Sequence, residues 1–144
     1  RNIKKKGKII FALGISINEQ CTFYDVSLRK KIINLLLKEF KNRFKLKYSP
    51  RATIFEFNKY YLIDNKLMLE EICNYNDIII TDYSTSLITC ANKGIKTISI
   101  LDMAEVTDKK MFNFWKAWLK KHNSKFPVFP KNTKQLLNYI RVYD

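Results

Sequence analysis

A run of three isoleucines between polar residues, Asp77-Ile78-Ile79-Ile80-Thr81-Asp82, limits the possible folds more than any other part of the chain. It is too short for a typical helix and leaves no polar face, so a strand here must be covered on both sides. Residues 8–13 and 95–101 form similar apolar runs, and the first of them ends at Gly14. Strands of this kind are typical of parallel sheets, in which helices cover both faces.

Segments with helical periodicity separate these runs. Residues 25–43 carry apolar side chains at helical spacing, and Asp25 or Ser27 is the expected cap. Helices are also predicted over 66–75, 87–93 and 111–121 and after a cap at Asn132 or Thr133, with strand-like segments at 44–48 and 126–130. The alternation predicts an α/β fold: a three-layer, doubly wound, mostly parallel sheet, Rossmann-like in arrangement.

Composition supports one globular domain spanning residues 1–144. Apolar residues make up 47% of the chain, which is enough for a core and argues against disorder. Only 3 Gly, 3 Pro and 3 Cys are present, which excludes collagen and disulfide-scaffold classes. No apolar run approaches the roughly 20 residues that a membrane-spanning helix needs.

The cysteines and the histidine limit the chemistry that this chain can perform. Cys21, Cys73 and Cys90 lie far apart in sequence and match no zinc or redox spacing, so we expect reduced core thiols of a cytoplasmic protein. A single histidine, His122, argues against a histidine-rich metal site or a histidine-activated nucleophile. We therefore predict neither a metal nor a bound cofactor.

The net charge of +14, from 27 basic and 13 acidic residues, leaves two explanations open. Only residues 4–8 form a tight basic cluster, so the excess can reflect a genome that favours lysine codons. The alternative is attraction to polyanions such as nucleotides, anionic lipid surfaces or acidic polysaccharides. Nucleic acid is the less favoured partner, because no recognition motif is present.

Ligands of doubly wound sheets bind beyond the carboxyl ends of the strands, and this rule selects four loops. These are Gly14-Ile15-Ser16, Ser49-Pro50-Arg51, Asp82–Ser86 and Asp102–Glu105. In the third loop Ser84, Thr85 and Ser86 fall at a predicted helix start, where hydroxyls and unpaired amides favour an anion. An ordinary helix cap explains the same residues.

The other polar residues of these loops each have two interpretations. Arg51 can bind a phosphate or lie in solvent. Asp82 and Glu105 can bind ribose hydroxyls or accept backbone hydrogen bonds, and Tyr83 can stack on a base or pack in the core. The glycines form no dinucleotide fingerprint, and a Walker A lysine loop is missing.

The stretch from Asn76 to Ser86, continued by Ala91–Ile98, resembles a motif of bacterial surface-polysaccharide transferases with the GT-B architecture. This group includes the CDP-glycerol glycerophosphotransferase-like enzymes and the bacterial sialyltransferases. The resemblance covers residues 8 to about 101, the donor-binding half of such an enzyme. A histidine-proline motif of the family corresponds here to Ser49-Pro50, so this chain lacks the family's imidazole.

The resemblance implies a metal-independent transferase that uses a nucleotide-activated sugar or polyol donor in polysaccharide or capsule synthesis. Ser84–Ser86 would hold the donor phosphate, assisted by Ser49 and Arg51, with Gly14, Asp82, Tyr83 and Glu105 around the nucleotide. The saccharide acceptor and the general base would belong to an N-terminal domain outside this chain, so the catalytic residues stay unassigned. A nucleotide-binding module without catalysis and a basic nucleic-acid-associated domain are the alternatives.

The predicted helix at 111–121 has its own two interpretations. Met111, Phe114, Trp115 and Trp118 share one face, with lysines mostly elsewhere. The helix packs its aromatic face on the core or on another domain, or it attaches peripherally to the anionic inner face of a cell membrane.

Overall fold

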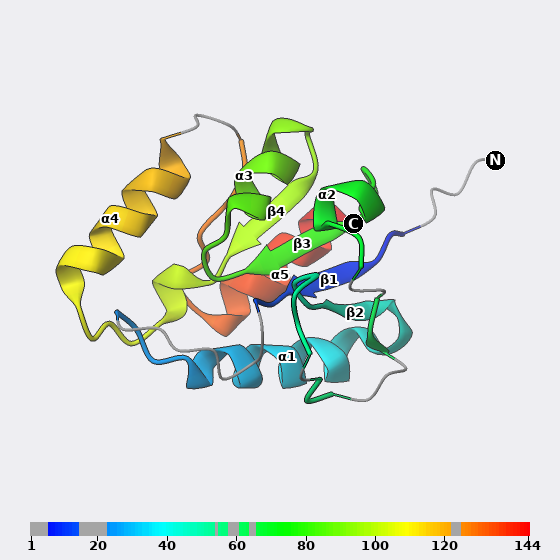
Figure 1. The fold of residues 1–144 in the computed structure, drawn as a ribbon, viewed down its shortest axis with the longest axis horizontal. Coiled ribbons are helices and arrows are strands. Elements are labelled where there is room, and N and C mark those ends of the chain that lie inside the picture. The colour runs from blue at the N-terminus through cyan, green and yellow to red at the C-terminus, as the bar shows by residue number, and fades with distance from the viewer. Residues whose placement is uncertain (1–5, 15–22, 54, 58–60, 64–65, 122–124) are drawn as a thin grey trace.

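Four short strands form one parallel sheet in the order β2-β1-β3-β4 (Figure 1). The computed structural model of the chain describes residues 6–14, 23–53, 55–57, 61–63, 66–121 and 125–144. The strands are β1 (Ile9–Ala12), β2 (Phe44–Lys47), β3 (Ile78–Thr81) and β4 (Lys96–Ser99). In register, Ile9 of the central β1 lies opposite Phe44 on one side and Ile78 on the other. The predicted parallel sheet is confirmed.

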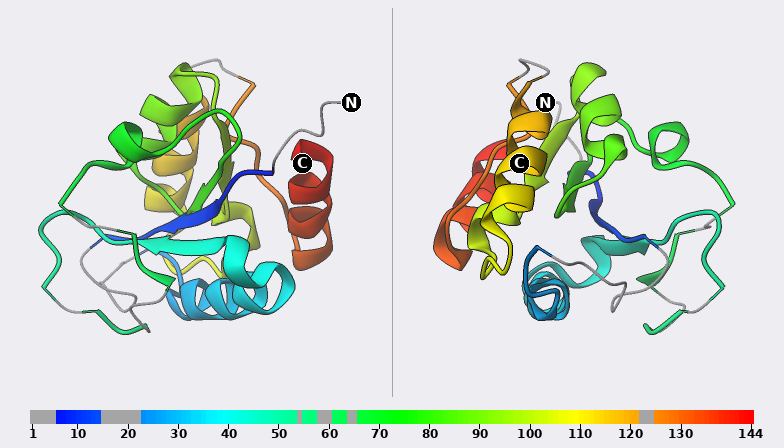
Figure 2. Two further views of the ribbon diagram at one scale, coloured as in Figure 1. Left: turned by 90° about the vertical axis from the view of Figure 1, so that its right-hand side faces the viewer. Right: turned by 60° about the vertical axis from the view of Figure 1, so that its left-hand side comes forward.

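Helices cover both faces of this sheet (Figure 2). Helix α1 (Ser27–Phe40) and helix α5 (Thr133–Tyr143) pack on one face together with Ile78 and Ile80. Helices α2 (Leu69–Ile72), α3 (Thr85–Asn92) and α4 (Lys109–Lys120) pack on the other face, where Ile79 points. The 3₁₀ turns η1 (Lys41–Arg43) and η3 (Leu101–Met103) lie in the connections between these elements. The three-layer α/β class is therefore confirmed, with the isoleucine run buried between two helical layers.

The edges of the sheet are extended by single bridges. Val128 pairs with Ile98 beyond β4, within the segment predicted to be extended, and Leu62 pairs with Leu46 beyond β2. These pairings satisfy part of the backbone that an open edge would expose.

Two local predictions are wrong. The helix expected over 66–75 is a single turn, because Cys73 has extended dihedrals and the buried Asp77 side chain accepts the Asn74 N–H at 3.0 Å. The cap position of α1 is Val26, which makes no capping bond, whereas Asp25 accepts the Ser27 N–H from outside the helix. That hydrogen bond lowers the pKa of Asp25. The α5 cap is Asn132, as expected, with its side chain accepting the Gln135 N–H at 2.9 Å.

Helix α4 packs only part of its predicted face on the core. Its buried residues are Phe112 and Leu119, and Trp115 and Trp118 are half-buried against the same cluster. Phe114, by contrast, is 59% exposed. The predicted face therefore divides between the tryptophans, which pack, and Phe114, which points outward. No helix among the described residues is long and apolar enough to cross a bilayer.

Candidate functional site

The strand order places a cavity where the chain changes direction across the sheet. From β1 the chain passes to β2 on one side and then to β3 on the other, so the loops after β1 and β3 diverge. A cavity of about 320 Å³ lies at this point. The loops after β1, β2 and β3 and parts of α1 and α2 line it: Ala12–Gly14, Arg29, Lys47–Arg51, Met68, Leu69 and Thr81–Ser86. The sequence predicted three of these loops.

One wall of the cavity is the N-terminus of α3. Ser84 is its N-cap, and its hydroxyl accepts the Ser86 N–H at 3.2 Å. The capping interpretation therefore holds for Ser84, whose hydroxyl proton can still be donated. Within the described part of the chain, the Thr85 amide and the hydroxyls of Thr85 and Ser86 have no hydrogen-bond acceptor of their own. These donors line the cavity, at the positive end of the helix dipole.

The opposite wall is a tight turn after β2. The Ala52 N–H donates to the Ser49 carbonyl at 2.9 Å, which places Pro50 at the position that a type I turn favours. The Ser49 hydroxyl accepts the Arg51 N–H at 3.3 Å, so Ser49 shapes the loop that carries Arg51. Ser49 also donates its N–H to the Gly14 carbonyl at 3.0 Å, and this bond joins the ends of β1 and β2. Arg51 is exposed and lines the cavity.

The floor of the cavity is a buried ion pair between Arg29 and Asp82. Arg29 of α1 and Asp82 at the end of β3 are 4% and 5% exposed. The Arg29 Nε and Nη2 atoms lie 2.7 and 2.6 Å from Asp82 Oδ2. The Tyr24 hydroxyl donates to the same oxygen, while Oδ1 accepts the Tyr83 N–H at 2.7 Å and the Thr81 hydroxyl at 3.2 Å. Both oxygens of Asp82 are thus occupied by the protein's own donors.

This network shifts the ionisation of its members. Burial raises the pKa of Tyr24, and the Asp82 charge raises it further. Burial by itself disfavours the Arg29 charge, but Asp82 outweighs it and the pKa of Arg29 is raised. At neutral pH Arg29 is therefore a guanidinium and Tyr24 a neutral phenol.

Tyr83 packs within the protein. Its ring centroid lies 4.9 Å from that of Phe23 and 5.0 Å from that of Trp115 on α4. Tyr83 still lines the cavity, so this aromatic row connects the cavity to the outer layer of helices.

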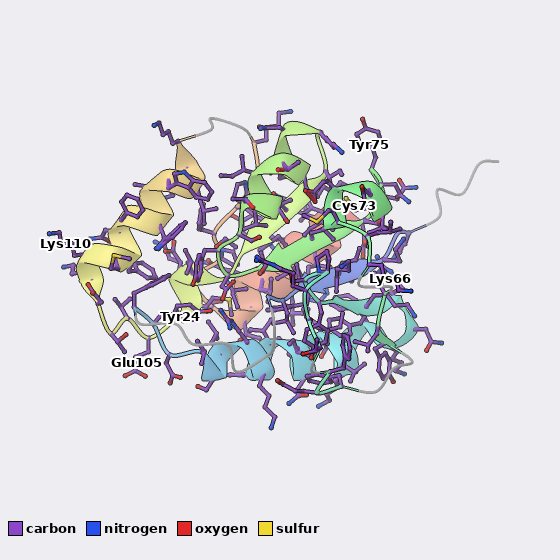
Figure 3. All side chains as sticks on the ribbon, viewed as in Figure 1. Tyr24, Lys66, Cys73, Tyr75, Glu105 and Lys110 are labelled. Atoms are coloured by element: carbon purple, nitrogen blue, oxygen red, sulfur yellow. The ribbon has the colours of Figure 1, made fainter. Side chains whose placement is uncertain are left out.

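The fourth predicted loop lies elsewhere. Glu105 is exposed and does not line the cavity, and its carbonyl accepts the Asp25 N–H at 2.9 Å (Figure 3). Asp102 pairs with Lys116 of α4 at 2.5 Å. This loop lies away from the cavity because β4 is the outermost strand, one position beyond the place where the chain reverses.

Some residues named in the sequence analysis lie outside the described residues. These are Ile15 and Ser16 of the first loop, Lys4 and Lys5 of the basic cluster, Cys21 and His122.

Several cavity and floor residues were not identified from the sequence, among them the polar side chains of Arg29, Lys47 and Tyr24. Arg29 stands at helical spacing from Ile32, Ile33 and Leu36, so a charge on the apolar face of that helix was a usable signal. Lys47 is 3% exposed, and its Nζ donates to the Tyr48 carbonyl at 2.5 Å. A lysine within a strand of a two-sided sheet was the corresponding signal.

The residues that line the cavity favour an anionic ligand. They include three basic side chains, Arg29, Lys47 and Arg51, and one carboxylate, Asp82. Among the described residues no group of three or more histidine, cysteine or acidic side chains is placed to hold a metal ion. The cavity therefore offers amide, hydroxyl and cationic donors.

Comparison of the chain with protein-family models, with curated proteins and with solved structures finds no significant match. The likeness to surface-polysaccharide transferases accordingly depends on the residues between Asn76 and Ile98, described above.

Proposed function

We propose that this domain binds the nucleotide-activated donor of a glycosyl- or polyol-phosphate transferase through the cavity at the carboxyl ends of β1, β2 and β3. The observation that carries the proposal is the position of Thr85 and Ser86. Their unpaired donors begin a helix on one side of a cavity that has basic side chains on the other. A phosphate group accepts such hydrogen bonds at a helix N-terminus.

The chemistry of this site is stabilisation of a leaving group. When a donor such as a CDP- or UDP-linked sugar is cleaved, negative charge develops on the nucleotide phosphate. The α3 N-terminus, the hydroxyls of Thr85 and Ser86, and Arg51 would favour that charge. The Asp82–Arg29 pair has a supporting role in this scheme, because it holds the end of β3 from which α3 starts.

Deprotonation of the acceptor is assigned to another part of the protein. Asp82 is the single carboxylate among the described residues that line the cavity, and donors already occupy both of its oxygens. Ser49, at the place of the family's histidine, orients a turn and has no proton to exchange near neutral pH. We therefore propose that this chain supplies donor binding and that an acceptor-binding domain supplies the base.

Isothermal titration of the chain with CMP, CDP and UDP tests the proposal. Arg51→Ala should weaken nucleotide diphosphate binding about 10- to 100-fold, because a charge-assisted hydrogen bond contributes about 1.5–3 kcal/mol. Arg141→Ala is the matched control, because Arg141 is an exposed arginine of α5 that does not line the cavity. Equal affinities of the two variants would contradict the site.

A transfer assay and a DNA-binding measurement separate the alternatives. A binding module without catalysis would bind nucleotides, but the protein that contains this domain would show no transfer to saccharide acceptors. A nucleic-acid-associated domain would bind random DNA more tightly than any mononucleotide and lose that binding steeply with salt.

Helix α4 supports a further proposal on location, namely peripheral contact with an anionic membrane. Phe114 and Met111 are 59% and 39% exposed, and Lys109, Lys110 and Lys121 are exposed beside them. Basic residues near such a surface contribute about 1 kcal/mol each, and salt screens them. Phe114→Ser should reduce co-sedimentation with anionic vesicles, whereas Val142→Ser, which alters another exposed apolar residue on α5, should not. Equal, negligible binding to anionic and neutral vesicles would contradict membrane contact.

A further inference from the structure

Two cysteines, one directly after α2 and one within α3, lie side by side on the face of the sheet that these helices cover. Cys73 follows the last residue of α2, and Cys90 lies in the last turn of α3. Their sulfur atoms are 3.6 Å apart, and both are free thiols in this structure. A disulfide requires about 2.05 Å between the sulfurs, so an approach of about 1.5 Å would join them.

The two thiols differ in access and in reactivity. Cys90 is fully buried, whereas Cys73 is half-buried. The hydrogen bond between the two thiols lowers the pKa of Cys73, and the same contact together with burial raises the pKa of Cys90. The thiolate is the reactive form of cysteine, so the more accessible sulfur is also the better nucleophile. This is the arrangement of an attacking thiol beside a resolving thiol.

We propose that Cys73 and Cys90 form an oxidative modification site, in which a hydroperoxide converts the two thiols into a disulfide that joins α2 to α3.

The reaction has two steps. The Cys73 thiolate attacks one oxygen of the hydroperoxide, an S–O bond forms, the O–O bond breaks, and the departing oxygen takes a proton and leaves as water or an alcohol. The Cys90 sulfur then attacks the Cys73 sulfenic acid and loses its proton, an S–S bond forms, and hydroxide leaves with that proton as water. The two thiols lose two electrons, which the O–O bond accepts.

The disulfide would act on a helix that is otherwise held weakly. Helix α2 is a single turn, anchored by the buried Leu69 and by a hydrogen bond from the Lys93 Nζ to the Glu70 carbonyl at 3.1 Å. Met68 and Leu69 also line the cavity. A covalent link from Cys73 to α3 would hold this side of the cavity against the helix whose N-terminus forms one of its walls.

The first test is treatment of the Cys21→Ser variant with hydrogen peroxide, followed by alkylation and mass spectrometry. We expect the two remaining thiols to resist alkylation in denaturant, where burial no longer protects Cys90, and to become reactive again after reduction by dithiothreitol. No lysine or arginine lies between Leu67 and Lys93, so trypsin leaves both cysteines on one peptide. A protease that cleaves at Asp77 and Asp82 separates them unless a disulfide joins the fragments.

Two outcomes would overturn the proposal: both thiols still alkylated after peroxide, or a disulfide that joins Cys21 in the unmodified sequence. The Cys73→Ser variant is the control, because it alters the half-buried member of the pair and leaves the buried Cys90 in place. It should form no internal disulfide in the Cys21→Ser background. Hydrogen exchange gives a second readout, since amides of residues 69–73 should exchange more slowly after oxidation, and unchanged exchange would contradict the link to α2.

Discussion

The two ends of β3 each carry a buried aspartate, and the two have different surroundings. Asp77, before the strand, is 1% exposed and accepts the backbone N–H groups of Lys8 and Asn74 at 2.8 and 3.0 Å. Its cationic partner, the Lys8 Nζ at 3.3 Å, is 38% exposed. Asp82, after the strand, depends on a buried arginine and on side-chain hydroxyls. Only Asp82 lies beside the cavity, because the loops diverge at the carboxyl ends of the strands.

The comparison teaches that the same residue type stabilises a strand end in two ways. Backbone donors hold Asp77 almost independently of the side chains around it. Tyr24 and Arg29, from one distant segment, hold Asp82, so its environment depends on the tertiary fold and extends to the candidate site. We therefore expect removal of the cationic partner to lower the free energy of unfolding much more at Asp82 than at Asp77.

Arg29→Ala should cause the largest loss in the free energy of unfolding. It leaves the Asp82 carboxylate buried without its cation, and breaking such a pair costs about 3–5 kcal/mol. Lys8→Ala should cost less than about 1 kcal/mol, because that lysine is partly solvated and the backbone donors to Asp77 remain. Urea unfolding of both variants measures the difference. Equal losses would mean that the two aspartates are held alike.

Gly7→Ala, at the amino end of the sheet, should cause the next largest loss of stability. A Cβ at Gly7 would lie 2.1 Å from the Asn76 carbonyl oxygen and 2.7 Å from the Asp77 nitrogen, both backbone atoms. Overpacking of this kind costs about 1–3 kcal/mol. Thermal unfolding measures the loss, and nucleotide affinity at a temperature where the variant is folded should stay unchanged. A change in affinity would couple the two ends of the sheet.

Ser84→Ala sharpens the comparison at the carboxyl end, with Asn132→Ala as its matched control. Both changes remove a helix N-cap, so each should lower the free energy of unfolding by about 1 kcal/mol. Only Ser84 lines the cavity, and only its loss should weaken CDP binding. Calorimetry on both variants, at matched folded fraction, checks this. Equal weakening would assign the effect to stability alone.

The smallest expected effect is that of Glu105→Gln on nucleotide binding. The exposed Glu105 side chain does not line the cavity, and its backbone carbonyl, which accepts the Asp25 N–H, is retained in the variant. Affinity for CDP should therefore stay within about twofold of the original. A loss comparable to that of Arg51→Ala would place Glu105 at the ligand and contradict the geometry described here.

Local patterns in the sequence determined the class of fold and most of its elements. The isoleucine run predicts β3 because three consecutive apolar β-branched residues suit a strand covered on both faces. The side chains of Ser84 and Asn132 mark helix starts, because a hydroxyl or amide oxygen satisfies an unpaired amide within three residues. These signals involve neighbours along the chain, so a single sequence contains them. The helix predicted over 66–75 is shorter in the structure because the Asp77 side chain competes for the backbone after α2.

Only the tertiary structure decided which polar residues meet. Arg29 lies 53 residues from Asp82 in sequence, and Cys73 lies 17 residues from Cys90. Glu105 and Asp82 both follow strands, yet Asp82 lines the cavity and Glu105 does not. These outcomes depend on strand order: β3 adjoins β1 at the reversal point, whereas β4 lies at the edge. Periodicity identifies a strand and its covered faces, but the order of strands arises from packing between distant segments.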